Sequence, residues 1–98
     1  MKIVLNTYYG GYSLSKKAYE YLGFKWDEYG YADNKDFGID SENDDAFRSD
    51  ERLVKCVEEL GKDASGSFAS LEVVEIPDDV KWVISEYYGY ESVEAGKE

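Results

Sequence analysis

The chain has 98 residues, of which 43% are hydrophobic and 16% aromatic, so its length accommodates one domain with a packed core and leaves no room for a second. Twenty-two acidic residues against eleven basic ones give a formal net charge of -11, which disfavours binding to nucleic acid or anionic membranes because both require cationic side chains. No apolar run approaches the roughly 20 residues of a membrane-spanning helix. The single cysteine excludes an intrachain disulfide and is typical of a reducing, cytoplasmic setting.

The beginning of the chain predicts a buried strand followed by a turn. Ile3 to Leu5 run together as the residues of an inner strand do, so we expect a strand over residues 2–6. The pair Gly10-Gly11 then breaks the pattern, because glycine favours turns and irregular backbone.

A first helix is expected to run to about Leu22. Ser13 is a suitable N-cap, with Ser15 as the alternative, and Gly23 fits the C-terminal end. Apolar positions at three- and four-residue spacing predict the face that meets the core. These positions are Leu14, Ala18, Tyr21 and Leu22.

Residues 24–50 form a long insertion that has no clean period and is rich in acids and aromatics. Ten acids and two bases, Lys35 and Arg48, lie between Asp27 and Glu51, which gives a local charge of -8. A connection this long is uncommon inside a compact domain and is usually functional or flexible. The interleaved aromatic residues indicate that the insertion is partly anchored to the body of the domain.

A second helix is expected from near Asp50, with Ser49 as a possible cap, to near Leu60 before Gly61. One side of it carries apolar residues at helical spacing, namely Leu53, Cys56, Val57 and Leu60.

The rest of the chain predicts strands. Residues 68–76 and 80–88 are separated by a Pro-Asp-Asp turn, and Gly89 allows a bend into a short strand over 90–93. The tail over 94–98 is expected to fray. The order β-α-α-β-β-β predicts an α+β fold in which two helices pack on one face of a small, mostly antiparallel sheet, as a single domain over residues 1–98.

Missing residue types limit the chemistry most. The chain has no histidine, which excludes histidine metal sites and nucleophiles activated by histidine. Cys56 lies on the apolar side of the second helix and is expected to pack in the core. No spacing singles out a pair of carboxylates for acid–base catalysis. We therefore expect no enzyme activity, no catalytic residues, no metal and no cofactor.

The Gly10-Gly11 turn supports an alternative hypothesis, a small-ligand or nucleotide-binding module. A glycine turn that leads into a helix can direct backbone N–H groups and the helix dipole at an anion. Neither the Walker pattern nor a complete G-x-G-x-x-G is present, so a purely structural turn is the competing interpretation. The residues expected to line this ligand site are Tyr9, Gly10, Gly11, Ser13, Ser15 and Lys16.

The acidic run that begins at Asp40 matches part of a calcium-binding loop. With Asp40 as the first ligand, the other acids at EF-hand positions three, five and twelve are Glu42, Asp44 and Glu51. Asp45, however, stands at the sixth position, which requires glycine, and no helix is expected before the run. Such a match arises easily by chance in so acidic a stretch.

Acids and tyrosines together favour a different use of the insertion. Carboxylates spaced along an aromatic surface can imitate a nucleic-acid backbone and occupy the basic groove of another protein. Tyrosines add contact area at little cost in rotamer entropy. The competing interpretation is a solvated acidic loop. The residues expected to bind the partner are Asp27, Glu28, Tyr29, Tyr31, Asp33, Asp36, Asp40, Glu42, Asp44 and Asp45.

Three blocks of sequence resemble a family of small uncharacterised bacteriophage and prophage proteins. The blocks are K-I-V-x-N…Y-G-G-Y-x-L-S over residues 2–15, L-V-x-x-V-E-E-L-G…A-S-G over 53–66, and L-x-V-V-E-I-P-D-D-V…E-Y-Y-G over 71–89. The chain departs from the family at Tyr88, where aspartate is usual, and at Tyr8, where cysteine is frequent. The resemblance implies an accessory protein expressed in a bacterial cytoplasm and brings no catalytic or binding residues with it.

The leading hypothesis is therefore a phage-encoded, non-enzymatic accessory protein that binds a host protein with a basic surface. By occupying that surface it would inhibit a nucleic-acid-binding defence factor, as anti-CRISPR and anti-restriction proteins do. It would act in the bacterial host cytoplasm, without direct contact to nucleic acid or membrane. A structural or virion protein that acts by self-association is the third hypothesis.

Overall fold

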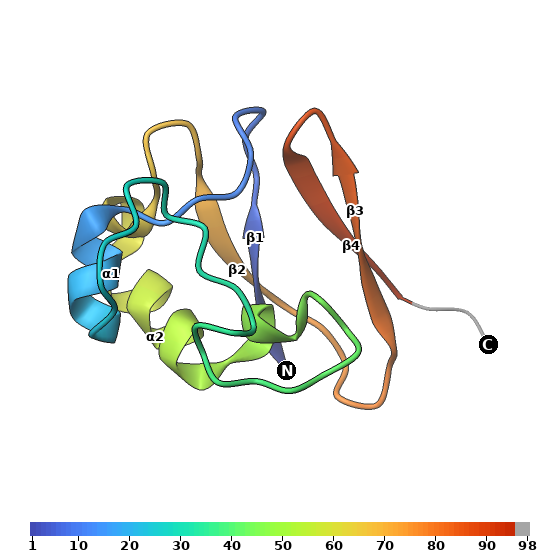
Figure 1. Cartoon of the computed structure of the whole chain (residues 1–98). Helices are drawn as coiled ribbons and strands as arrows, with labels where there is room; N and C mark the ends of the chain where they lie inside the picture. The colour runs from blue at the N-terminus through green and yellow to red at the C-terminus, as the bar shows by residue number, and fades with distance from the viewer. Residues whose placement is uncertain (96–98) are drawn as a thin grey trace.

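The computed structural model describes residues 1–95 and has the α+β architecture and the β-α-α-β-β-β order that the sequence predicted (Figure 1). Two 3₁₀ helices, η1 and η2, flank the second α-helix. Within the described residues the helices are too short and too polar to span a bilayer. In chain order the elements are β1 (Lys2–Asn6), α1 (Lys16–Leu22), η1 (Ala46–Ser49), α2 (Glu51–Leu60), η2 (Gly61–Ala64), β2 (Leu71–Glu75), β3 (Trp82–Tyr87) and β4 (Tyr90–Ala95).

The strand pairing is antiparallel, as predicted, but the strands divide into two sheets of two strands each. β1 pairs with β2, with Val4 opposite Val73. β3 and β4 form a separate hairpin in which Tyr87 lies opposite Tyr90. Both α-helices lie on the side of β1 and β2 away from this hairpin (Figure 1).

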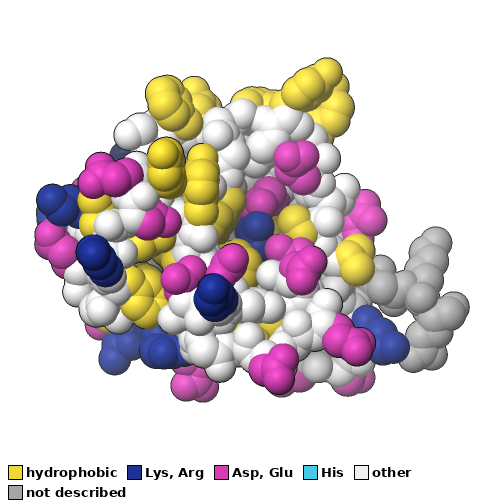
Figure 2. Space-filling view, in the orientation of Figure 1, with side chains coloured by type: hydrophobic (Ala, Val, Ile, Leu, Met, Phe, Trp, Pro, Cys, Tyr) yellow, Lys and Arg dark blue, Asp and Glu magenta, His cyan; other side chains and the backbone are white. Residues whose placement is uncertain are grey.

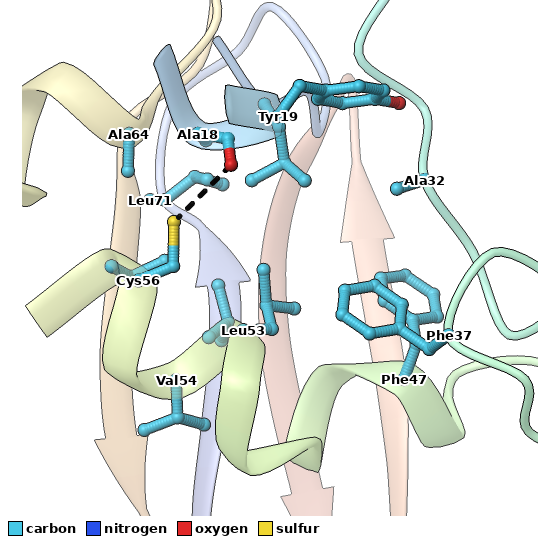
Figure 3. Close-up of a cluster of buried hydrophobic side chains, with 13 residues drawn as sticks. Ala18, Tyr19, Ala32, Phe37, Phe47, Leu53, Val54, Cys56, Ala64 and Leu71 are labelled. Atoms are coloured by element: carbon cyan, nitrogen blue, oxygen red, sulfur yellow. Dashed lines mark hydrogen bonds between the residues drawn. The ribbon is translucent and has the colours of Figure 1, made fainter. Parts of the chain in front are cut away.

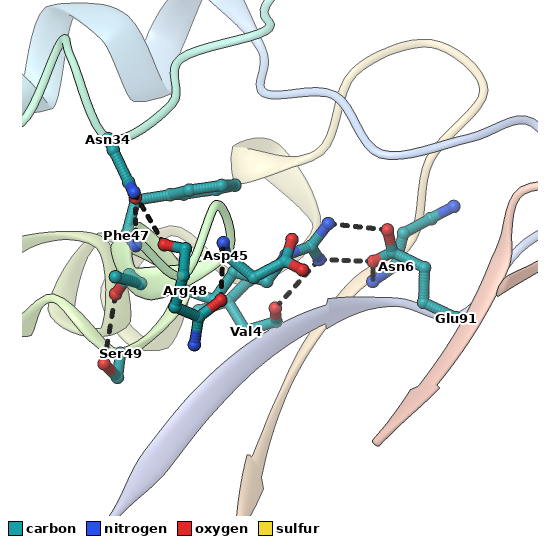
Figure 4. Close-up of polar contacts among 10 residues, drawn as sticks. Val4, Asn6, Asn34, Asp45, Phe47, Arg48, Ser49 and Glu91 are labelled. Atoms are coloured by element: carbon teal, nitrogen blue, oxygen red, sulfur yellow. Dashed lines mark hydrogen bonds and ion pairs between the residues drawn. The ribbon is translucent and has the colours of Figure 1, made fainter. Parts of the chain in front are cut away.

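Side chains, and not a backbone ladder, join β1 to β4 (Figure 4). The backbone N–H of Asn6 donates to Glu91 Oε1 at 2.8 Å, and the carbonyl of Val4 accepts a hydrogen bond from Arg48 Nη1 at 3.3 Å. Arg48 and Glu91 are buried and bonded to each other. Because this ion pair satisfies polar groups on the free edge of β1, the edge is not available to pair with β4, and the single predicted sheet is split.

Local capping explains where α1 begins and ends. The side chain of Ser15 accepts a hydrogen bond from Ala18 N, and Gly23 closes the helix with a φ of 78°. Ser13 is therefore not the cap. Its carbonyl instead accepts a hydrogen bond from Gly66 N at 3.0 Å, which keeps this part of the chain extended. The prediction that Tyr21 lies on the apolar face is wrong, because Tyr21 is exposed. Tyr19 is buried instead.

The second helix follows the prediction closely. Asp50 is its N-cap, with a side-chain oxygen 2.9 Å from Arg52 N. Ser49 is not the cap, because it belongs to η1 and its hydroxyl donates to the carbonyl of Ala46. The predicted apolar side is confirmed: Leu53, Cys56 and Val57 are buried and Leu60 is partly buried.

One hydrophobic cluster lies between the helices, β1 and the insertion (Figure 3). Residues 24–50 contribute Ala32, Phe37 and Phe47 to it, so the insertion is ordered and anchored by its aromatic residues. Cys56 lies inside the cluster, where burial raises the pKa of its thiol to about 11 and leaves the group in its unreactive form.

The strand boundaries differ from those expected. The predicted strand over 68–76 begins only at Leu71, because residues 66–69 form a turn closed by the bond from Ala69 N to the Gly66 carbonyl. Glu94 and Ala95, assigned to a frayed tail, belong to β4. The remaining predicted tail residues, 96–98, lie outside the described part of the chain.

Candidate functional site

A surface groove brings together parts of both predicted sites. It encloses about 690 Å³ and is formed where residues 10–16, 26–31 and 65–68 meet. A groove of this size is within the range of small-molecule sites and is also large enough for several side chains of a partner protein. Among the described residues, Lys16 is the one basic and Glu28 the one acidic side chain in its lining.

Close backbone contacts form the floor of the groove. Leu14 N donates to the carbonyl of Gly30 at 2.8 Å, and on the opposite side Ser15 N donates to Ala64 at 2.9 Å. A Cβ on Gly30 would lie 2.1 Å from the carbonyl oxygen of Leu14, and the φ of Gly30 is +86°. Only glycine tolerates both the close contact and the positive φ. The position of the adjacent loop with Tyr29 and Tyr31, which we call the aromatic wall, therefore depends on Gly30.

Asp27 organises that wall. Its carboxylate accepts hydrogen bonds from Tyr29 N at 2.8 Å, Gly30 N at 2.6 Å and Tyr31 N at 3.3 Å, and from the hydroxyl of Tyr19 at 3.0 Å. Desolvation by neighbouring atoms acts to raise the pKa of Asp27, but the N–H groups of Gly30 and Tyr29 outweigh it and hold the pKa below its usual value. Asp27 therefore shapes the loop and is not a free charge for a partner.

Tyr29 and Tyr31 project from the loop that Asp27 holds. Their rings stack with centroids 6.0 Å apart and planes 8° from parallel. They are 68% and 62% exposed, whereas tyrosine is on average intermediate in burial. The two tyrosines predicted as anchors are thus side by side and accessible.

The predicted partner-binding acids fall into two groups. Asp33, Asp36 and Asp45, like Asp27, make hydrogen bonds inside the insertion, to Lys35 N, Asp33 N and Arg48 respectively. The others are exposed and have no hydrogen bond or ion pair within residues 1–95: Glu28, Asp40, Glu42 and Asp44. Acidic side chains are scattered over the face in Figure 2 and do not form one compact patch there.

The calcium-loop spacing does not correspond to a cage. Among the described residues, no three side chains of the metal-ligating types come close enough to hold an ion. Glu51, the twelfth position of the match, is the first residue of α2.

Five of the six residues predicted for a ligand site line the groove, namely Gly10, Gly11, Ser13, Ser15 and Lys16. Tyr9 does not, because its ring turns toward Tyr90, 5.4 Å away. The Ser15 side chain is already engaged with Ala18 N and with the carbonyl of Asp63, and α1 has only seven residues. The Ser15 hydroxyl is therefore not available to a phosphate.

Sequence reasoning missed several exposed aromatic residues outside the insertion. A signal was present, because the tripeptide Tyr-Tyr-Gly occurs twice, at 8–10 and 87–89. In the fold these two turns meet: a Cβ on Gly89 would lie 2.4 Å from Gly11 N and 2.9 Å from the carbonyl oxygen of Tyr9. Hydrophobic side chains accordingly project along the upper edge of Figure 2, above the tip of the β3–β4 hairpin and the neighbouring loops of Figure 1.

Comparisons with protein-family models, with curated proteins and with solved structures found no match to this chain.

Proposed function

We propose that the chain is a non-enzymatic binding protein that docks on a basic surface of another protein. The observation that carries the proposal is an ordered insertion that exposes a stacked tyrosine pair, Tyr29 and Tyr31, together with four carboxylates that have no partner among residues 1–95. In the bacteriophage context that the sequence resemblance implies, the partner is a host defence factor whose nucleic-acid-binding groove is blocked.

The two kinds of side chain have different tasks in this proposal. The net charge of -11 accelerates encounter with a basic surface and weakens that attraction when salt is added. The tyrosines supply the contact area that holds the complex together. Because core residues and hydrogen bonds already order the insertion, it loses little conformational entropy when it binds.

The test compares two variants that each remove four charges. The first changes the unpaired acids of the insertion: Glu28→Gln, Asp40→Asn, Glu42→Gln and Asp44→Asn. The matched control changes four exposed acids elsewhere that have no partner within residues 1–95: Glu20→Gln, Glu75→Gln, Asp79→Asn and Glu94→Gln.

Immobilised wild-type protein is expected to capture nucleic-acid-binding proteins from a bacterial lysate at low salt, and excess duplex DNA should release them. The insertion variant should lose this capture while the control variant keeps it. Equal capture by all three proteins, or capture that DNA does not compete with, would contradict the proposal.

The groove supports a second candidate, a small-ligand-binding module. Its volume of about 690 Å³ and its aromatic wall suit a planar ring, such as a nucleotide base, stacked beside Tyr29. A ligand that binds only the folded chain raises the melting temperature, and the rise grows with the logarithm of the ligand concentration once that concentration exceeds Kd. A thermal-shift panel of nucleosides and nucleotides, with Tyr29→Ser as the control, tests this candidate, and no shift at millimolar ligand would contradict it.

A further inference from the structure

Six exposed aromatic residues form a second surface, which we call the aromatic edge. They come from three turns that are distant in sequence, residues 8–9, 68 and 87–90. Their exposed fractions range from 40% for Tyr90 to 74% for Tyr88. The members of the aromatic edge are Tyr8, Tyr9, Phe68, Tyr87, Tyr88 and Tyr90.

Glycine contacts lock the three turns together. A Cβ on Gly10 would lie 1.9 Å from the carbonyl oxygen of Phe68, and one on Gly89 would lie 2.4 Å from Gly11 N. Asn6 adds a polar tie, since its side-chain amide donates to the carbonyls of Tyr8 at 2.8 Å and Gly89 at 2.7 Å. The rings are therefore presented on a backbone that is held in place before any partner arrives.

Tyr88 occupies a backbone conformation that tyrosine does not favour. It has a φ of +50° and Gly89 a φ of +89°, which makes Tyr88-Gly89 the two-residue turn between β3 and β4. That turn prefers asparagine, aspartate or glycine at the first position, and a bulky residue there is strained. The stability of the hairpin alone would favour asparagine, aspartate or glycine at position 88. The presence of an exposed tyrosine there therefore requires an explanation other than stability.

The charge around the edge indicates what it would contact. Residues 7–12, 65–70 and 86–91 contain no lysine or arginine, although the chain has eleven. The faces of aromatic rings carry negative potential and attract cations. A second copy of the chain is a poor occupant, because it carries the same charge of -11.

We propose that the aromatic edge binds an arginine-bearing segment of the partner protein. The inference rests on the proposed function and specifies the recognition chemistry. A guanidinium is planar and weakly hydrated, so it stacks on tyrosine while its N–H groups stay free for hydrogen bonds. An ammonium is compact and strongly hydrated. The edge therefore distinguishes arginine from lysine, which a negative field alone does not.

The test uses two synthetic 12-residue peptides with the same spacing of charges, one with arginine and glycine alternating and one with lysine and glycine. Binding is followed at low salt by amide chemical shifts of the labelled protein. The arginine peptide is expected to bind about two- to fivefold more tightly and to shift residues 87–90.

Two variants at one position separate binding from folding. Tyr88→Asn should weaken the arginine peptide about two- to fivefold while raising the melting temperature by about 4 °C, because it removes both the ring and the backbone strain. Tyr88→Phe keeps the ring and should retain the binding.

Equal affinities for the two peptides, or an unchanged affinity of Tyr88→Asn for the arginine peptide, would overturn the inference that the aromatic edge binds arginine. If the two peptides bind equally and change the amide chemical shifts of the insertion alone, the proposed function is unaffected. If neither peptide binds at low salt, both the aromatic-edge inference and the proposed function fail.

Discussion

The guanidinium of Arg48 and the carboxylate of Glu91 form a bidentate ion pair whose side chains are only 6% and 7% exposed, between two sheets that share no backbone hydrogen bonds (Figure 4). Arg48 also lies over the Tyr12 and Phe47 rings, at 4.7 and 5.2 Å. Burial alone would lower the pKa of Arg48, but the hydrogen bonds and charge of Glu91 raise it, so the guanidinium stays charged. This contact fixes the hairpin, and with it the aromatic edge, on the rest of the domain.

Removing one member of the pair should destabilise the protein strongly. Glu91→Leu or Arg48→Met is expected to lower the free energy of unfolding by about 3 to 5 kcal/mol, because each leaves an uncompensated buried charge. The double variant Arg48→Met, Glu91→Leu should lose less than the sum of the two. Urea denaturation provides all three values, and strictly additive losses would show that the residues do not act as a pair.

The hydroxyl of Tyr12 is buried and has no hydrogen-bond partner in residues 1–95, and burial raises its pKa. Tyr12→Phe removes a desolvated group without breaking a bond, so the free energy of unfolding should stay constant or rise by up to about 1 kcal/mol. Tyr19→Phe is the control, because it breaks the bond to Asp27 and should cost about 1 kcal/mol. A clear loss in Tyr12→Phe would indicate an undetected partner for the hydroxyl.

Asp27 predicts a pH dependence. Its pKa is lowered in the folded state, so its stabilisation is complete above the ordinary value of 3.8 and is lost as the pH falls through the folded pKa. Asp27→Asn should therefore lower the urea midpoint at neutral pH and converge with wild type once the pH falls below the folded pKa of Asp27. Asp40→Asn, whose side chain has no partner within residues 1–95, should match wild type throughout. A gap that persists unchanged in acid would show that the charge of Asp27 is not the cause.

Gly30 and Gly23 separate steric contact from backbone strain. Both have positive φ, +86° and +78°, but a Cβ on Gly30 meets Leu14 whereas one on Gly23 meets nothing within 4 Å. Gly23→Ala should cost about 1 kcal/mol from strain alone. Gly30→Ala should cost at least about 2 kcal/mol and displace Tyr29 and Tyr31, visible as shifts of their ring signals. Equal losses of unfolding free energy in the two variants would show that the backbone at the floor of the groove moves easily to accommodate a Cβ.

Local signals were sufficient for much of the fold. The apolar run of β1, the helical spacing from Leu53 to Val57 and the glycine at position 23 each act through neighbours a few residues away, so their elements were predicted correctly. The choice of Ser15 over Ser13 as the N-cap was not local, since the backbone of Ser13 is held by Gly66. The aromatic residues of the insertion indicated anchoring, and the fold shows which of them, Phe37 and Phe47, enter the core.

The sequence by itself determined the class of the fold, the order of its elements and the excess of negative charge, because composition and short-range periodicity carry that information. Only the tertiary structure decided that the sheet splits around Arg48 and Glu91, and that the two Tyr-Tyr-Gly turns meet. These contacts join residues 43 or more positions apart in the chain. They depend on close packing and on the burial of a charge pair, and neither leaves a periodic trace in the sequence.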